Sequence, residues 1–289
     1  MLASGVHGSS LSKVLEAIRL GAGGAVTKSI GPEPRDGYPE PTLVEADAGT
    51  VNAAGLPNPG ALKFSQDLAT IEGKGLPVVV SIFGGDEAEF GKVVAALDPG
   101  DFVAYELNLS CPHVEGVGTE VGHDPDLVER VVREVKARTR KPVLAKLSPN
   151  TDRLLEVAEA AVSGGADGLT AINTLSAFPI DIETGRPALS HGFGGLSGGA
   201  IRPVALRCVY ELKEDVDVPI IGCGGISKWE HAVEFLLAGA DAVQVGIATA
   251  KKLAIFNEIN LGIISYLERK GIPRLADVVG AAHRGGFPR

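Results

Sequence analysis

Several side chains that can carry out chemistry follow one apolar segment of the sequence. Phe102–Leu107 is rich in β-forming residues and predicts a strand. Directly after it come an amide, a hydroxyl, a thiol and an imidazole, at Asn108, Ser110, Cys111 and His113. These groups can transfer protons and can form hydrogen bonds to a polar ring. Because α/β proteins place their sites beyond the carboxyl ends of strands, this position favours a catalytic role.

Cys111 also has a simpler interpretation. Free cysteine is among the most buried residue types and commonly packs as a small hydrophobe. A packing cysteine sits within an element, whereas Cys111 is expected just past the end of a strand. On the residues alone, both interpretations stay open.

Two lysines stand at the ends of further predicted strands. Lys28 follows Ala25-Val26-Thr27, and Lys146 lies in Leu144-Ala145-Lys146-Leu147. An ammonium group among apolar neighbours needs an anion or an electron-rich partner, because an unpaired buried charge is costly. That partner is either a bound ligand or an acidic side chain of the protein.

Glycines close the last two predicted strands, in Gly222-Cys223-Gly224-Gly225-Ile226 and Gln244-Val245-Gly246-Ile247-Ala248. Glycine lets backbone N–H groups approach a ligand closely, and a short helix starting near Ile247 would point its positive end the same way. In barrels this pair of loops commonly holds a phosphate. Each loop alone is equally consistent with a tight strand-to-helix turn.

Strands and helices alternate along the whole chain, and Gly-Ala pairs commonly end a helix just before an apolar strand. Eight short apolar runs predict strands, at Leu2–Ser4, Ala25–Ser29, Val78–Phe83, Phe102–Leu107, Val143–Leu147, Gly168–Ile172, Ile220–Gly222 and Ala242–Val245. Eight such units favour one α/β domain over residues 1–289, a closed (β/α)8 TIM barrel.

Two of the intervening helices can be placed by their caps. One begins at Pro125 with Asp124 as its N-cap. Another follows Thr151, ends before Gly164, and is expected to turn five residues inward: Leu154, Leu155, Ala158, Ala161 and Val162.

Two connections are too long for simple turns, at about 30–59 and 173–199. The first contains a candidate hairpin, Thr42–Val44 with Thr50–Asn52. The second is rich in glycine and proline and predicts a mobile lid. Both leave the carboxyl ends of strands, so the unusual sequence gathers on the face where barrel sites lie.

Composition excludes several functional classes. The net charge of -9 argues against a nucleic-acid partner, and no apolar run reaches the length of a membrane span. The N-terminus lacks a secretory signal pattern, and three scattered cysteines predict neither a disulfide framework nor a metal site. No metal is therefore expected, and a reducing cytoplasm is the expected location.

At this point the sequence resembles a family, the class 1 dihydroorotate dehydrogenases, and within it the catalytic subunits of the 1B type. The resemblance runs from Ala3 to about Ala250 and rests on the segments VTKSIGPEPRDGYPEPT, NAAGLPNPG, ELNLSCP, AKLSPN, ADGLTAINT, IDIETGRP, GGLSGGAIRP, PIIGCGGI and AVQVG. It implies an enzyme of pyrimidine biosynthesis that carries FMN at the carboxyl ends of the strands and oxidises dihydroorotate to orotate.

The resemblance also implies roles for individual residues. Cys111 would be the base that removes the C5 proton, while a hydride passes from C6 to the flavin. The implied FMN positions are Ser4, Lys28, Ser29, Ser81, Asn108, Lys146, Ile172, Gly198, Gly224, Gly225, Gly246 and Ile247. The implied substrate positions are Lys28, Asn52, Ala53, Ala54, Gly55, Leu56, Asn108, Asn173 and Thr174.

Three departures from the family pattern bear on these roles. His113 stands where an asparagine is usual, and the form NLSCPH also resembles dihydropyrimidine dehydrogenases, which reduce uracil and thymine. Ile247 replaces a common threonine, and the chain starts within the first predicted strand. An enzyme for an uncarboxylated pyrimidine and a flavin-binding electron-relay subunit therefore remain alternatives.

Partners are implied by the same resemblance. The chain has neither cysteine clusters for an iron–sulfur centre nor a dinucleotide fingerprint in the right strand-to-helix context. Electrons would leave through a subunit carrying FAD and a [2Fe–2S] cluster, on the way to NAD. A homodimer core within a heterotetramer is the expected assembly.

Overall fold

A curled parallel sheet forms the centre of the molecule in a computed structural model, which describes every residue except 6, 9, 111–120 and 288–289. Its seven strands are β1 (Ala25–Val26), β4 (Val78–Ile82), β5 (Ala104–Asn108), β6 (Val143–Lys146), β7 (Gly168–Ala171), β12 (Ile220–Cys223) and β13 (Ala242–Gln244). They pair in this order, which is their order along the chain. Each of them falls on a predicted strand, with ends that differ by up to three residues.

The first predicted strand is reduced to isolated bridges. Leu2 pairs in parallel with Ala25 at one edge of the sheet and with Val245 beyond the other edge. Backbone hydrogen bonds accompany both bridges, from the Ala3 amide to the Val245 carbonyl and from the Val26 amide to the Leu2 carbonyl. Leu2 therefore contacts both edges of the sheet.

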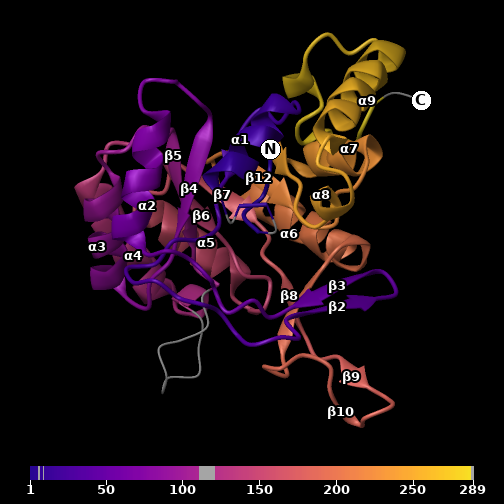
Figure 1. Ribbon diagram of the computed structural model, residues 1–289. Helices are drawn as coiled ribbons and strands as arrows, with labels where there is room; N and C mark the ends of the chain where they lie inside the picture. Colours follow the sequence, from indigo (N-terminus) through magenta and orange to yellow (C-terminus); the bar gives the residue numbers. More distant parts are fainter. Residues whose placement is uncertain (6, 9, 111–120, 288–289) are drawn as a thin grey trace.

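Helices cover the outer face of this sheet (Figure 1). They are α1 (Leu11–Arg19), α2 (Ala61–Leu68), α3 (Glu87–Leu97), α4 (Pro125–Arg138), α5 (Leu154–Ser163), α6 (Arg202–Asp215), α7 (Trp229–Ala238), α8 (Ala248–Lys251) and α9 (Ile255–Lys270). Within the described part of the chain, none is long and apolar enough to cross a membrane.

The predicted helix caps are largely confirmed. The Asp124 carboxylate accepts hydrogen bonds from the amides of Asp126 and Leu127, and proline occupies the first turn of α4. In α5 the prediction for Leu155 was wrong, because this side chain is exposed and Val157 is buried in its place. Leu155 lies about 100° round the helix from Leu154, which carries it off the buried face.

The two long connections pair with each other. The predicted hairpin is confirmed as β2 (Leu43–Ala46) and β3 (Gly49–Asn52). The segment predicted to be a mobile lid contains β8 (Leu175–Ala177), β9 (Ile180–Asp181), β10 (Arg186–Pro187) and β11 (Gly194–Ser197), and its mobility stays a prediction. Since β11 pairs with both β3 and β8, the two connections form one four-stranded sheet, which projects from one end of the molecule (Figure 1).

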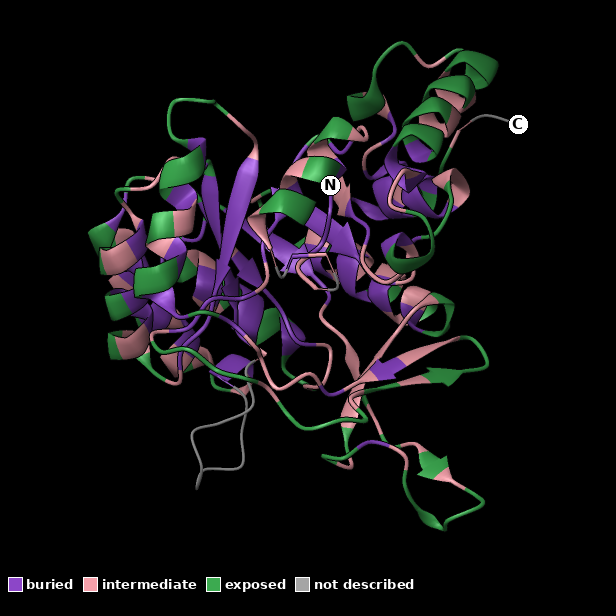
Figure 2. Ribbon diagram, in the orientation of Figure 1, coloured by how far each residue is buried: buried purple, intermediate pink, exposed green. Residues whose placement is uncertain are grey.

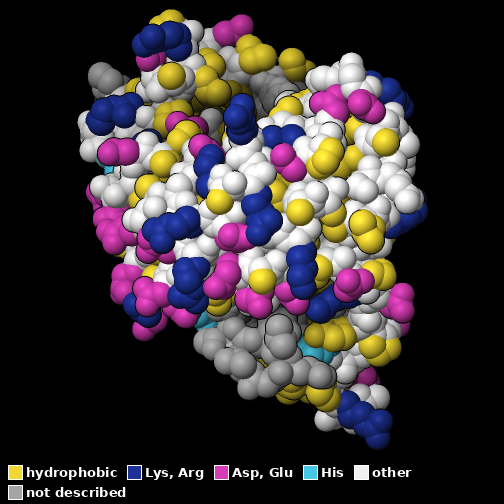
Figure 3. Space-filling view, turned by 90° about the vertical axis from the view of Figure 1, so that its left-hand side faces the viewer, with side chains coloured by type: hydrophobic (Ala, Val, Ile, Leu, Met, Phe, Trp, Pro, Cys, Tyr) yellow, Lys and Arg dark blue, Asp and Glu magenta, His cyan; other side chains and the backbone are white. Residues whose placement is uncertain are grey.

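Burial follows this architecture. The strands of the central sheet and the inward faces of the helices are buried, and the outer helix faces are exposed (Figure 2). Over α2, α3 and α4, basic and acidic side chains are interspersed (Figure 3). Several pair there, such as Arg130 of α4 with Glu87 of α3, so this face is an ordinary solvated surface without a basic patch.

Candidate active site at the carboxyl ends of the strands

Two adjoining cavities open where the strands of the central sheet end. The first, of about 340 Å³, lies beneath the four-stranded sheet, and the second, of about 230 Å³, lies against the glycine loops after β12 and β13. They share eight lining residues: Ser4, Gly5, Lys28, Asn52, Ala54, Lys146, Asn173 and Thr174. The site is therefore one space with two compartments.

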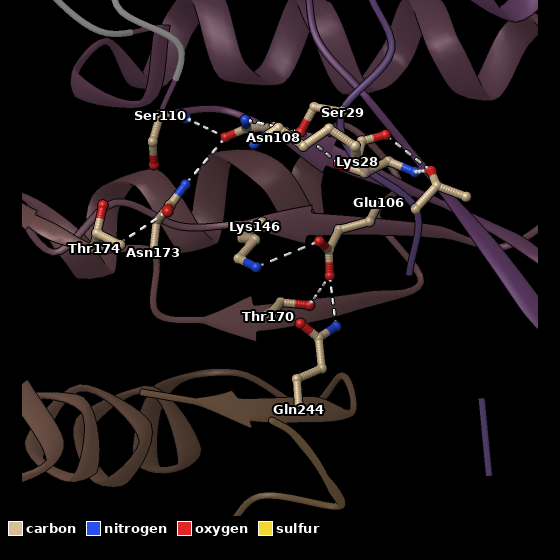
Figure 4. Close-up of polar contacts among 12 residues, drawn as sticks. Lys28, Ser29, Glu106, Asn108, Ser110, Lys146, Thr170, Asn173, Thr174 and Gln244 are labelled. Atoms are coloured by element: carbon tan, nitrogen blue, oxygen red, sulfur yellow. Dashed lines mark hydrogen bonds and ion pairs between the residues drawn. The ribbon is translucent and has the colours of Figure 1, made fainter. Parts of the chain in front are cut away.

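Asn108, the last residue of β5, is held in place on both sides of its amide. Its Nδ2 donates to Ser29 Oγ at 3.1 Å, and its Oδ1 accepts from Asn173 Nδ2 at 3.1 Å (Figure 4). The Ser110 amide donates to the same Oδ1 at 3.3 Å. These contacts fix which edge of Asn108 donates and which accepts, as recognition of a polar ring requires.

Beside this amide network, the Ser110 hydroxyl has no partner among the described residues. Its Oγ is buried and lacks a hydrogen bond among the described residues. Because a buried hydroxyl normally finds a partner, this orphan group at the first cavity indicates a polar ligand.

Lys28 lines both cavities without an acidic partner in the described chain. Burial lowers the pKa of its ammonium group, and no carboxylate among the described residues offsets that effect. A bound anion would supply the missing negative charge. Of the two explanations open for the lysines, a ligand therefore suits Lys28.

Lys146 differs, because it has an acidic partner within the protein. Its Nζ lies 3.5 Å from Glu106 Oε1, and both side chains are buried. Burial lowers the pKa of Lys146, but the charge of Glu106, with a smaller contribution from Cys223, raises it, and the net direction is upward. Lys146 therefore stays charged while it lines both cavities.

The glycines of the second cavity serve two purposes. A Cβ added at Gly225 would lie 2.7 Å from the Gly198 carbonyl oxygen, so close backbone packing alone requires glycine there. At Gly246 the nearest atom to an added Cβ is 3.7 Å away, and packing does not demand glycine. Its bare backbone instead leaves space for a ligand in the second cavity.

Comparison with known proteins assigns the chain to a family. The sequence model of the dihydroorotate dehydrogenases matches residues 1–267. The chain belongs to the dihydroorotate dehydrogenase family. It is 51% identical over 286 residues to the catalytic subunit of dihydroorotate dehydrogenase B (NAD(+)) of Pyrococcus furiosus, covering 98% of this chain and 94% of the relative. The protein of the same name from Methanocella arvoryzae is 45% identical over 284 residues, covering 98% and 93%.

Membership confirms the resemblance drawn from the motifs and makes the chain an oxidoreductase of the dihydroorotate dehydrogenase type. All the residues implied for cofactor or substrate, apart from Cys111, line the two cavities. Ile172, Gly198, Gly224, Gly225, Gly246 and Ile247 line the second, while Ser29, Ser81, Ala53, Gly55, Leu56 and Asn108 line the first. An anionic group against the glycines and a flat polar ring towards Asn108 would fit this arrangement.

Cys111 and His113 lie outside the described residues. The chain is described up to Ser110 and again from Val121, and Gly122 donates from its amide to the Leu109 carbonyl at 2.8 Å. The roles of both residues in a dihydroorotate dehydrogenase remain predictions from the motif ELNLSCP and the residue that follows it.

Other lining residues were not predicted. Tyr38 and His191 stack with ring centroids 4.0 Å apart and line the first cavity together with Arg35 and Phe193. Arg35 exchanges two backbone hydrogen bonds with Asn58, which tie two parts of the first long loop together. Glu106 was also missed, although an acidic residue between Tyr105 and Leu107 of a predicted strand was a visible signal.

Proposed function

We propose that this chain oxidises dihydroorotate to orotate in pyrimidine biosynthesis, with FMN bound across the two cavities. The observation that carries the proposal is Lys28, a partly buried cation without an acidic partner in the described chain, in a cavity that the amides of Asn52, Asn108 and Asn173 also line. Dihydroorotate has the matching chemistry, a carboxylate on a ring whose edge alternates donors and acceptors. Lys28 would bind the carboxylate, and Asn52, Asn108 and Asn173 would bind the ring.

FMN fits the remaining residues. The glycine backbone at Gly224, Gly225 and Gly246 would hold the phosphate, while Lys146 and Asn108 would contact the ring. FMN supplies the hydride acceptor of the reaction. The protein binds and orients the substrate, and Lys146 places a fixed positive charge where negative charge develops.

Cys111 is the proposed base for the C5 proton. A thiol suits this step better than a hydroxyl, because its pKa lies closer to neutrality. In the sequence, Cys111 directly follows Ser110, which borders the first cavity together with Asn108 at the end of β5.

The same proposal extends to the assembly. The sheet would close as an eight-stranded barrel, since Leu2 already contacts both edges. Electrons would leave FMN through a partner subunit with FAD and a [2Fe–2S] cluster, on the way to NAD. The relatives' designation as a catalytic subunit supports such a partner.

Assays with defined acceptors test this function. We expect the isolated chain to oxidise dihydroorotate with an artificial acceptor, to leave dihydrouracil unchanged, and to reduce NAD only when the electron-transfer subunit is added. Turnover of dihydrouracil in preference to dihydroorotate would contradict the substrate assignment. Efficient NAD reduction by the chain alone would contradict the need for a partner.

A further inference from the structure

A buried polar cluster lies among the strands beneath the two cavities. Its centre is Glu106 of β5, whose side chain is 0% exposed. Glu106 Oε2 accepts hydrogen bonds from Thr170 Oγ1 of β7 at 3.1 Å and from Gln244 Nε2 of β13 at 2.6 Å (Figure 4). Three strands of the sheet therefore fix the position of one carboxylate.

The second oxygen of this carboxylate faces Lys146. Glu106 Oε1 has no hydrogen-bond partner among the described residues and lies 3.5 Å from Lys146 Nζ. The figure shows the ammonium directed towards the carboxylate (Figure 4). Because Lys146 also lines both cavities, it stands between Glu106 and the bound ring of the proposed function.

Few other charged or titratable groups face Lys146. Cys223 of β12 acts on it electrostatically, and burial raises the pKa of this thiol, which keeps it neutral. The N-terminal amine of Met1 acts on Cys223, and Lys28 borders the same cavities. Glu106 is thus the acidic side chain that balances the Lys146 charge within the described residues.

We infer that Glu106 is a positioning residue, which keeps Lys146 protonated beneath the flavin at every pH at which the enzyme works. This inference rests on the proposed FMN function. With Glu106 in place, reduction of the flavin finds Lys146 already charged and takes up no proton there. Without Glu106, the buried ammonium loses its proton in the oxidised protein and regains it when negative charge arrives on the ring.

A purely structural role for the pair makes a different prediction. Buried ion pairs are often replaceable by neutral groups of similar volume without loss of folding. If Glu106 only fills space and satisfies Thr170 and Gln244, an isosteric amide will change stability but leave the proton balance of flavin reduction unaltered. The pH dependence of the flavin potential separates the two roles.

The test is the midpoint potential of bound FMN from pH 6 to 9, in the wild type and in Glu106→Gln. We expect the Glu106→Gln potential to fall more steeply with rising pH, by up to one additional proton per two electrons. One proton corresponds to about 30 mV per pH unit for a two-electron couple. If the midpoint potentials of the two proteins change with pH at the same slope, the inference is overturned, even if the potentials themselves differ.

Two further variants isolate the Glu106–Lys146 pair. Cys223→Ala removes the other titratable group that acts on Lys146 and should keep the wild-type slope. In Glu106→Gln/Lys146→Met the additional slope should vanish, because no ammonium group remains to titrate. Persistence of the additional slope in the double variant would also overturn the inference.

A charge-preserving exchange covers the case in which Glu106→Gln fails to fold. Glu106→Gln/Gln244→Glu keeps the cluster's composition and total charge but moves the carboxylate away from Lys146. In this variant we expect the flavin potential to show part of the additional pH slope. A slope equal to that of the wild type would again contradict the role of Glu106. Wild-type protein that binds no FMN would contradict the proposed function itself, and the two failures are therefore distinguishable.

Discussion

Asn173 donates from Nδ2 to Oδ1 of Asn108 at 3.1 Å, which ties the amides of two separate strand ends into one recognition surface. The Thr174 amide donates to Asn173 Oδ1 at 2.9 Å, so the orientation of the Asn173 amide is fixed as well. A ligand in the first cavity therefore meets amides that are already oriented.

This relationship predicts the effect of Asn173→Asp, which keeps the shape but removes the donor. Asn108 Oδ1 would face a negative charge, and an anionic ligand would meet one as well. Loss of a buried partner costs about 1–3 kcal/mol, which corresponds to roughly 5- to 150-fold weaker orotate binding. Titration with orotate, followed by the change in flavin absorbance, measures this affinity.

Asn260→Asp is the matched control for this variant. Asn260 is exposed on α9, donates to the Gly21 carbonyl, and should tolerate the same change without effect on orotate binding. Orotate affinity of Asn173→Asp within twofold of the wild type would show that the Asn108–Asn173 pair does not contact the ligand.

Lys28 predicts a pH dependence of orotate binding. Burial lowers the pKa of this ammonium group in the free protein, and a bound carboxylate raises it again. Binding is therefore linked to proton uptake by Lys28. Affinity should be constant below the lowered pKa of the free protein and fall as the pH rises through it.

Lys28→Met is the reference for that experiment. It should bind orotate weakly at neutral pH. Its orotate affinity should also lack the pH dependence that is due to Lys28. Any pH dependence due to ionisation of orotate itself is the same for both proteins. If the two pH profiles differ only by a constant factor across the whole range, Lys28 does not titrate against the ligand.

Cys111→Ser should bind FMN normally but reduce it far more slowly with dihydroorotate at neutral pH. A positioned general base contributes about 10²–10⁴-fold, and serine has a much higher pKa than cysteine. Stopped-flow measurement of flavin reduction gives the rate. Cys208→Ala is the control, because Cys208 is buried within α6 and should not affect the rate. Undiminished reduction in Cys111→Ser would remove the thiol from the mechanism.

The sequence predicted the strand ends well, because local signals determine them. Apolar runs and helix caps are enough to place Asn108, Lys146 and the glycine loops at one end of the sheet. A parallel sheet covered by helices then brings these ends together. The prediction of the site followed from this regularity.

Contacts between distant segments could not be predicted in the same way. Whether Lys146 pairs with an acid or a ligand depends on which side chains of β5, β7 and β13 meet inside the sheet. Likewise, the segment predicted as a mobile lid contains a strand, β11, whose Leu196 pairs with Val51 of β3. Glycine and proline content reveals neither pairing.

Anaerobic addition of dihydroorotate to the purified, flavin-loaded chain tests the proposed reaction most directly. Loss of the oxidised flavin absorbance near stoichiometric dihydroorotate, with orotate as product, is the expected result. Dihydrouracil should leave the absorbance unchanged, because it lacks the carboxylate that Lys28 would bind. A chain without flavin, or a flavin that dihydrouracil bleaches and dihydroorotate does not, would contradict the proposed function.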